Sequence, residues 1–199
     1  MFDVQVCNHE ECSRLRVFNR LTCFEHSENA EELQKQIEKY LSENTKLMGL
    51  SLSRIRLKDM DLSNKEIWGC NFASSYFENV DFSGCTIIYS YFDFSQFRKC
   101  NLENTNLRNA VYAGSKIIDS SFNSSEITIC NFLGTHCVNT SFNDCDLYAT
   151  RFINSKLEDL QFVDCNLKRT HFSNSELKNT QFKYSNVEEA YFEGVIESK

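Results

Sequence analysis

Residues 100–114 read CNLEN-TNLRN-AVYAG, three successive five-residue units with the same order of residue types. The third residue of each unit is large and apolar: Leu102, Leu107 and Tyr112. This phase extends in both directions from the quoted stretch. An apolar residue occupies the third position of 29 consecutive units, from Leu52 to Phe192.

The first position of each unit is small or modest in size from Cys70 onward, and Val80 and Leu160 are the only large exceptions. The remaining positions are mostly Asp, Asn, Ser, Glu, Lys and Arg. A period of five fits neither a helix, which repeats its apolar residues at 3.6, nor a strand, which repeats them at 2. Self-similarity at a fixed period indicates a repeat solenoid. We expect each unit to form one side of a coil, with its first and third residues pointing inward.

The third positions also predict how many sides the coil has. From Tyr112 onward they alternate between aromatic residues, as in Phe122 and Phe132, and others, as in Ile117 and Ile127. Rings prefer to stack on rings. A period of ten therefore requires an even number of units per coil, and two would make too tight a turn. Four units give a square coil of 20 residues, whereas three would place Phe over Ile throughout.

The units Cys70-Asn71-Phe72-Ala73-Ser74, Cys100-Asn101-Leu102-Glu103-Asn104 and Cys165-Asn166-Leu167-Lys168-Arg169 carry a small–Asn–Leu/Phe–x–x pattern. This pattern resembles the pentapeptide-repeat family over about three quarters of the chain. The resemblance implies an all-β solenoid, a right-handed quadrilateral parallel β-helix. About seven coils at roughly 4.8 Å each would make a rod of roughly 35 Å.

The N-terminal segment predicts a small appendage and a cap. Residues 1–27 form a Cys/His module, 28–48 a capping helix, 49–194 the β-helix and 195–199 a tail. Asn29 and Glu32 have the spacing of a capping box, and Leu33, Ile37, Tyr40 and Leu41 form one apolar stripe. We expect this helix, over residues 29–45, to cover the third-position leucines of the first coil. Its polar face is not basic, which argues against a membrane-surface helix.

Cys7, Cys12, Cys23 and His26 have the spacing Cys-x4-Cys-x10-Cys-x2-His. Three thiolates and an imidazole suit zinc in a closed structural site. His9 is a rival for a ligand position, and the alternative is a loose arm with three free thiols. The other cysteines at first positions are interpreted as buried free thiols in a reducing cytoplasm, with disulfides as the alternative.

Outward positions that break the polar rule mark candidate contact sites. Those near the N-terminal third are predicted to form an exposed apolar patch: Trp68, Ile88, Tyr89, Tyr91 and Phe94. The alternative is that the N-terminal module covers them. A second candidate is the C-terminal end of the rod, where an uncovered edge favours an end-to-end homodimer. Its residues are Leu177, Phe182, Val187 and Phe192. Here the alternative is that Val195 and Ile196 fold under the last coil.

No catalytic motif is visible, and the sequence favours a non-enzymatic rod that presents flat faces to an unknown protein partner. The family resemblance supplies an alternative: some members mimic DNA and inhibit or protect DNA gyrase or topoisomerase IV. This chain shares the acid excess, with 19 acids against 15 bases over residues 49–199, but it lacks an inserted loop and a C-terminal dimerising helix. No direct nucleic-acid binding is expected from such a surface, because a binder needs a basic footprint.

The sequence has no apolar run of membrane-spanning length and no signal-peptide pattern, so we expect a cytoplasmic protein.

Overall fold

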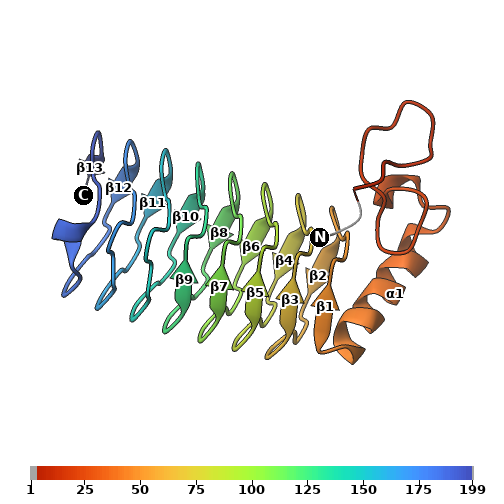
Figure 1. Cartoon of the computed structure of the whole chain (residues 1–199), viewed down its shortest axis with the longest axis horizontal. Coiled ribbons are helices and arrows are strands. Elements are labelled where there is room, and N and C mark those ends of the chain that lie inside the picture. Colours follow the sequence, from red (N-terminus) through yellow and green to blue (C-terminus); the bar gives the residue numbers. More distant parts are fainter. Residues whose placement is uncertain (1–3, 199) are drawn as a thin grey trace.

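Backbone pairing in the computed structural model, which describes residues 4–198, confirms the 20-residue coil. Every strand pairs in parallel with the strand 20 residues away, as Lys46 does with Glu66. The coils stack into a straight parallel solenoid (Figure 1). It has about eight turns, one more than the sequence predicted. The repeat is longer at both ends than predicted: one strand (Lys46–Met48) lies within the range assigned to the capping helix, and another (Ile196–Ser198) within that assigned to the tail.

Two sides of the solenoid are regular sheets made of three-residue strands. The five-stranded sheet has the order β1-β3-β5-β7-β9. Its strands are β1 (Lys46–Met48), β3 (Glu66–Trp68), β5 (Thr86–Ile88), β7 (Asn106–Arg108) and β9 (Glu126–Thr128). The eight-stranded sheet has the order β13-β12-β11-β10-β8-β6-β4-β2. Its strands are β2 (Arg56–Lys58), β4 (Tyr76–Glu78), β6 (Gln96–Arg98), β8 (Lys116–Ile118), β10 (His136–Val138), β11 (Lys156–Glu158), β12 (Glu176–Lys178) and β13 (Ile196–Ser198).

The other two sides are ladders of single β-bridges, again with partners 20 residues apart. One ladder begins Asp61↔Asp81, and the other begins Ser51↔Asn71. The second ladder continues through Tyr91, Val111, Asn131, Arg151 and His171 to Tyr191. We call this side of the rod the 51–191 face. Four ladders in one coil confirm the four-sided cross-section.

The corners between the sides require a backbone conformation that most residues avoid. The fifth residue of nearly every unit from Arg54 to Gly194 has a positive φ, between 47° and 70°. Asn, Asp and Gly tolerate this left-handed region best, and they occupy most of these positions. The polar fifth positions of the sequence are therefore corner residues, which turn the chain from one side to the next.

Third-position side chains fill the interior in columns of like residues. The aromatic rings of Phe92, Tyr112 and Phe132 stack with centroids 5.0 and 4.8 Å apart. A second aromatic column meets the first edge-on, as Phe142 meets Phe132 at 87°. The non-aromatic third positions form columns of their own, including Ile117, Cys137 and Leu157. Rings stack on rings, as the alternation in the sequence predicted.

First-position side chains do more than fit a small space. Ser155 Oγ donates to the carbonyl of Phe132 at 2.9 Å, and the hydroxyls of most other first-position Ser and Thr residues bond to a carbonyl 23 residues earlier. Cysteine thiols occupy the same place, as Cys145 Sγ lies 3.0 Å from the carbonyl of Phe122. All ten cysteines are free, so no disulfide links the coils. The ladder explains why these positions favour Ser, Thr and Cys over Ala.

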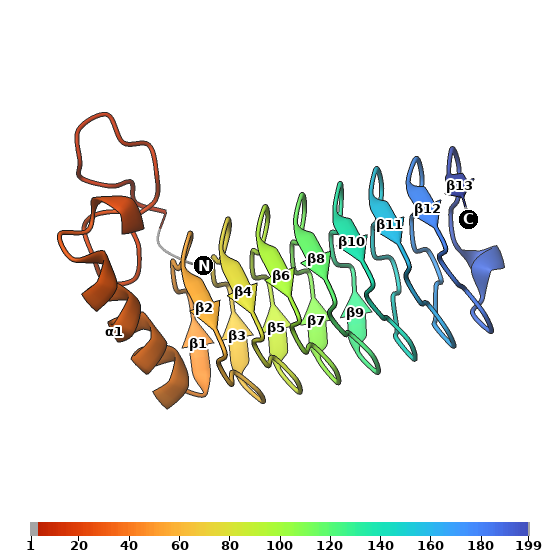
Figure 2. The ribbon, with the colours of Figure 1, turned by 180° about the vertical axis from the view of Figure 1, so that it is seen from behind.

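The helix α1 (Ala30–Glu43) closes the N-terminal end of the rod (Figures 1 and 2). Asn29 caps it as predicted, accepting a hydrogen bond from the Glu32 N–H at 3.0 Å. Its apolar stripe of Leu33, Ile37 and Leu41 is buried in one continuous core with the first-coil leucines. The predicted capping role is thereby confirmed. Two short 3-10 turns complete the fold, η1 (Phe24–His26) and η2 (Val187–Glu189).

A buried lysine holds the end of this helix. Lys65 occupies the first position of its unit, where most units carry a small residue, and only 6% of it is exposed. Its ammonium donates to the carbonyl of Asn44 at 2.9 Å and lies 3.4 Å from that of Ser42. A cation at a helix C-terminus satisfies carbonyls that have no partner within the helix. None of the described helices is long and apolar enough to cross a membrane.

Candidate metal centre and candidate interaction face

Four side chains of the N-terminal module converge on one point. The donor atoms of Cys7, Cys12, Cys23 and His26 all lie within 4.8 Å of one another. Cys7 Sγ is 3.5 Å from His26 Nδ1, and Cys12 Sγ is 3.9 Å from Cys23 Sγ. Bond lengths of about 2.3 Å to sulfur and about 2.0 Å to nitrogen place tetrahedral zinc ligands about 3.5–3.8 Å apart. The donor set and its spacing therefore fit a zinc ion.

Two tight turns bring these donors together. In the first, the Cys7 N–H donates to the Arg14 carbonyl at 2.8 Å, and the Cys12 N–H donates to the His9 carbonyl at 3.2 Å. In the second, η1 carries His26 round to Cys23, whose carbonyl accepts from the His26 N–H at 3.2 Å. His9, the rival ligand, lies outside the cluster and stacks on the ring of His26, with centroids 3.8 Å apart.

The cluster also favours the thiolate form at one cysteine. Burial raises the pKa of Cys7, but hydrogen bonds from the backbone N–H groups of Cys23 and His9, with a further bond to His26, lower it to about 6. Burial raises the pKa of Cys23. Because the thiolate is the metal-binding form of cysteine, Cys7 is prepared to bind a cation at neutral pH.

The module rests on the N-terminal coil rather than on the apolar patch. The Phe18 N–H donates to the Ser51 carbonyl, and Ser51 Oγ donates to the Arg16 carbonyl, both at 2.6 Å. Val17 is fully buried in the main core. Arg54 forms an ion pair with Glu25 at 3.0 Å. These contacts place the module at the start of the 51–191 face, beside the helix, where Figure 1 shows it projecting from the rod.

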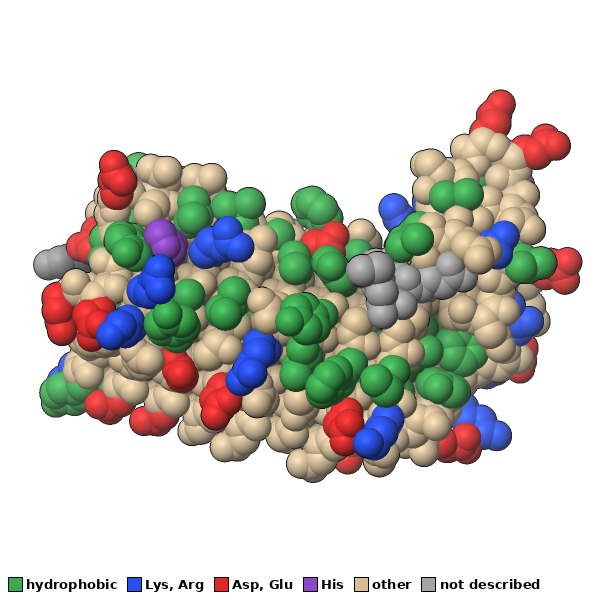
Figure 3. All heavy atoms as spheres, in the orientation of Figure 1, with side chains coloured by type: hydrophobic (Ala, Val, Ile, Leu, Met, Phe, Trp, Pro, Cys, Tyr) green, Lys and Arg blue, Asp and Glu red, His purple; other side chains and the backbone are tan. Residues whose placement is uncertain are grey.

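The predicted patch spans two sides of the rod. Tyr91 lies on the 51–191 face, Tyr89 and Phe94 lie at its two corners, and Trp68 and Ile88 lie on the adjoining five-stranded sheet. Phe94 is 69% exposed, Tyr89 60%, Trp68 41% and Tyr91 40%, while Ile88 is partly buried. Figure 3 shows hydrophobic side chains gathered over this part of the rod. Three exposed residues that the sequence analysis missed extend the patch: Met48, Ile129 and Leu133. The 20-residue spacing could have identified two of them from the sequence. Met48 lies one coil before Trp68, and Ile129 lies two coils after Tyr89.

Several patch residues occupy corners where the backbone disfavours them. Tyr89, Phe94 and Ile129 have φ values of 51°, 56° and 56°. The left-handed conformation costs about 1–2 kcal/mol for an ordinary residue, and a bulky or β-branched residue there is an outlier. The Phe94 ring also lies against Gly114, at the same corner of the following coil. A Cβ on Gly114 would come within 2.7 Å of this ring. Exposed side chains in strained positions suggest a role outside folding.

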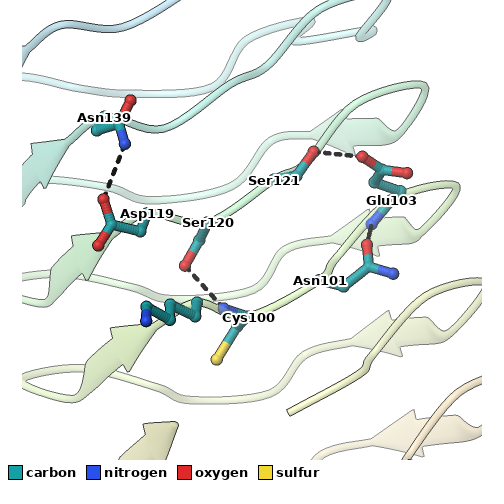
Figure 4. Close-up of a pocket in the computed structure, with 8 residues that line it drawn as sticks. Cys100, Asn101, Glu103, Asp119, Ser120, Ser121 and Asn139 are labelled. Carbon is teal, nitrogen blue, oxygen red and sulfur yellow. Dashed lines mark hydrogen bonds between the residues drawn. The ribbon is translucent and has the colours of Figure 1, made fainter. Parts of the chain in front are cut away.

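A separate hollow on the rod has the character of ordinary surface. Its lining includes Cys100, Glu103, Asp119 and Ser121 (Figure 4). Ser121 Oγ donates to Glu103 at 2.6 Å, and Asn139 Nδ2 donates to Asp119 at 2.8 Å. Burial raises the pKa of the Cys100 thiol to about 11, which keeps it protonated. These groups bind one another between coils, and no nucleophile–base pair is among the described residues that line the hollow.

The C-terminal end of the core is only partly covered. Leu177 is buried, Phe182 and Phe192 are partly buried, and Val187 is exposed. The rings of Phe172 and Phe192 stack at 5.0 Å, so the aromatic column continues into the last coil. Val195 packs against the core, whereas Ile196 is exposed. Among residues 4–198, nothing at this end corresponds to the helix that closes the other.

Among the solved structures, HetL shares the fold of this chain at low sequence identity. HetL, a pentapeptide repeat protein involved in heterocyst differentiation regulation in the cyanobacterium Nostoc sp. strain PCC 7120, is 11% identical with a TM-score of 0.61. The match covers 86% of this chain and 93% of that one. The plasmid-mediated fluoroquinolone resistance protein QnrB1 is 18% identical, with 77% and 92% covered and a TM-score of 0.36. No curated protein sequence matches this chain.

Family models agree with the repeat that the sequence displays. The model described as pentapeptide repeats (8 copies) matches residues 51–87, and that described as a pentapeptide repeat region matches residues 115–192. Together they match more than half of the chain. The family is generally structural and non-enzymatic. With its square coils, its columns of third-position residues and these matches, the chain belongs to the pentapeptide-repeat family.

Proposed function

We propose that this protein is a non-enzymatic interaction rod whose protein partner binds the exposed patch of Trp68, Ile88, Tyr89, Tyr91 and Phe94. One observation carries the proposal: Tyr89 and Phe94 are exposed, bulky and held at left-handed corners. Asn fits the same place, as it does at Asn109 and Asn174. The fold therefore gains little from these two rings, whereas aromatic side chains are common energetic centres of protein interfaces.

Site-specific photo-crosslinking tests this proposal. A photo-crosslinking amino acid replaces Asn109, which is one coil after Tyr89 on the same corner, in the full-length protein expressed in its own cells. The matched control places the same amino acid at Asn179, a left-handed residue on a different corner. We expect a discrete protein adduct from position 109 and none from position 179.

Two further variants decide whether the adduct depends on the patch. Tyr89→Asn with Phe94→Asn should abolish the adduct at position 109, because it removes both rings and keeps the corner conformation. Tyr184→Asn, which removes another exposed left-handed tyrosine far from the patch, should leave the adduct intact. An adduct that persists in the double variant would contradict the proposal.

The DNA-mimic alternative places gyrase or topoisomerase IV as the partner. It calls for a continuous acidic surface, but acids on the rod alternate with lysines. Ion pairs join successive coils between Lys46 and Glu66, Lys58 and Glu78, and Lys156 and Glu176. These pairs favour the apolar contact over charge mimicry. A supercoiling assay with purified gyrase separates the two, since inhibition or quinolone protection at micromolar rod would support the mimic.

We infer that the N-terminal module binds a structural zinc ion through Cys7, Cys12, Cys23 and His26. The donor spacing described above supports this assignment, and four protein ligands leave no open position for a reactive water. The segment is too short to fold around a core of its own, so a metal would contribute much of its folding free energy. Zinc here would hold Val17 and Phe18 against the first coil.

Metal analysis tests the zinc proposal on protein purified under reducing conditions. We expect about one zinc per chain. Cys23→Ser should lose it, and Cys137→Ser, a cysteine buried within the rod, should retain it. Protein without zinc after reductive handling would refute the assignment.

We also propose that the partly covered C-terminal coil pairs with a second copy through Leu177, Phe182, Val187 and Phe192. An exposed apolar column beside unpaired strand edges favours association. Light scattering measures the mass directly: a dimer is expected, and Val187→Asp should convert it to a monomer. A monomeric wild-type protein at about 100 μM would contradict this proposal.

A further inference from the structure

The C-terminal half of the 51–191 face differs from the apolar half in charge. Arg151 and His171 lie on the face itself, and Lys168 and Arg169 lie at its border. Figure 3 shows blue side chains and a histidine toward the C-terminal end of the surface whose middle is hydrophobic. The same side of the rod therefore carries an apolar segment followed by a cationic one, on a protein whose net charge is −7.

Two of these cations have no acidic partner within the described part of the chain, whereas several lysines elsewhere on the rod form ion pairs between coils. Among residues 4–198, neither Arg151 nor Arg169 forms an ion pair with a carboxylate, although Lys168 pairs with Glu189 at 3.3 Å. Both arginine side chains lower the pKa of His171, after the effect of its burial, so positive potential accumulates here. Lys58, Lys156 and Lys178 of the eight-stranded sheet instead form ion pairs with glutamates of the neighbouring coil.

One arginine is also held in place. Arg169 Nη1 donates to the Tyr148 hydroxyl at 3.2 Å, and the His171 ring stacks on Tyr191 with centroids 4.2 Å apart. Oriented guanidinium groups on a scaffold of rings suit planar carboxylates, which accept two parallel hydrogen bonds. Arg169 would thus lose less side-chain conformational entropy when a carboxylate of the partner binds it.

We propose that an extended acidic–aromatic segment of the partner protein binds this face, an inference that rests on the proposed function. Its apolar side chains bind the Tyr89–Phe94 patch, and its carboxylates bind Arg151 and Arg169. Three to four coils separate Tyr91 from Arg151 and His171, which corresponds to about 14–19 Å at roughly 4.8 Å per coil. An extended chain spans this distance with about four to six residues.

Peptide selection tests the chemistry of this face directly, because random sequences stand in for the partner. A displayed library of random peptides of about 12 residues is selected on the full-length protein. We expect enriched peptides to combine aromatic or aliphatic residues with Asp or Glu about four to six residues away. Selection on Arg151→Glu with Arg169→Glu should replace the acids with Lys or Arg and keep the apolar residues.

Binding of a synthetic selected peptide, measured by fluorescence anisotropy, makes the comparison quantitative. The double charge reversal should weaken it by about ten-fold or more, as should Tyr89→Asn with Phe94→Asn. Lys116→Glu, an exposed lysine on the eight-stranded sheet, should change it by less than about two-fold. Trp68, the single tryptophan, provides an intrinsic fluorescence signal at the apolar end.

The outcomes separate this inference from the function on which it rests. Peptides that require Tyr89 and Phe94 but carry no acids, or ignore the arginines, would overturn the acidic segment and leave the interaction patch standing. Failure to enrich any peptide that depends on Tyr89 and Phe94 would overturn both. Arginine-dependent binding of a single-stranded DNA oligonucleotide more tightly than the peptides would assign the cations to nucleic acid and also refute the inference.

Discussion

The tyrosine hydroxyl of Tyr112 lies inside the aromatic column of the core, among apolar rings. Tyr112 is fully buried between Phe92 and Phe132, and its oxygen has no hydrogen-bond partner among the described residues. A buried polar group without a partner costs about 1–3 kcal/mol. Burial likewise raises the pKa of this phenol well above its usual value. The ring thus stabilises the column while its hydroxyl opposes it.

Tyr112→Phe should therefore raise the free energy of unfolding by about 1 kcal/mol, because the ring stack is retained and the unpaired hydroxyl is removed. Urea denaturation followed by circular dichroism measures the change. Phe132→Tyr, which adds a hydroxyl in the same column, should have the opposite sign. A destabilised Tyr112→Phe would indicate a partner for this oxygen.

The first-position hydrogen bonds yield a second prediction at this scale. Ser155→Ala removes a donor to the Phe132 carbonyl and an acceptor for the Thr135 N–H, so it should cost about 1–3 kcal/mol of stability. Ser155→Cys should cost less, because thiols make the equivalent contact at Cys145 and Cys165. Equal losses in the two variants, compared by urea denaturation, would show that size alone matters here.

Residue-level patterns were only partly predictable from the sequence. The inward third positions followed from periodicity alone, because an apolar residue recurs at every fifth position from Leu52 to Phe192. The donor role of Ser155 did not follow, because a pattern of residue sizes does not show whether a small side chain donates a hydrogen bond. The strain at Tyr89 and Phe94 was also missed. It was detectable in principle, because Asn, Asp and Gly dominate the fifth position.

At the level of elements, α1 illustrates which part of a cap a sequence can specify. Asn29 and the stripe of Leu33, Ile37 and Leu41 defined its start and its buried side. Its end was harder to place, because the residue that secures it, Lys65, is 21 residues beyond Asn44 and belongs to a different element. Long-range capping leaves no local signal in the helix sequence. The same limitation hid the contacts between Ser51 and the Cys/His module.

Lys65→Met should destabilise the N-terminal end of the rod by about 1.5–3 kcal/mol, because it keeps the apolar stem and removes a charged donor from buried carbonyls. Hydrogen exchange localises the effect, with faster exchange expected in α1 and β1. Lys116→Met, an exposed lysine, serves as the control and should change stability by less than about 0.5 kcal/mol. Unchanged exchange in α1 would remove the capping role.

For the whole molecule, the solenoid separates stability from recognition. The interior columns and the ladders between coils extend along the entire rod, so its shape does not depend on any one surface residue. The 51–191 face is consequently free to carry side chains unrelated to folding. It holds an apolar segment near the module and a cationic one near the other end, and the partner itself lies beyond what one sequence specifies.

Tyr89 and Phe94 are proposed above to serve contact with a partner and not folding. The most direct test of this role is the free energy of unfolding of the double variant Tyr89→Asn with Phe94→Asn, measured together with its crosslinking yield from position 109. We predict a protein as stable as the wild type, or more stable by up to about 2 kcal/mol, whose partner adduct is lost. A variant less stable by more than about 1 kcal/mol would contradict the claim, because it would show that the rings support the fold.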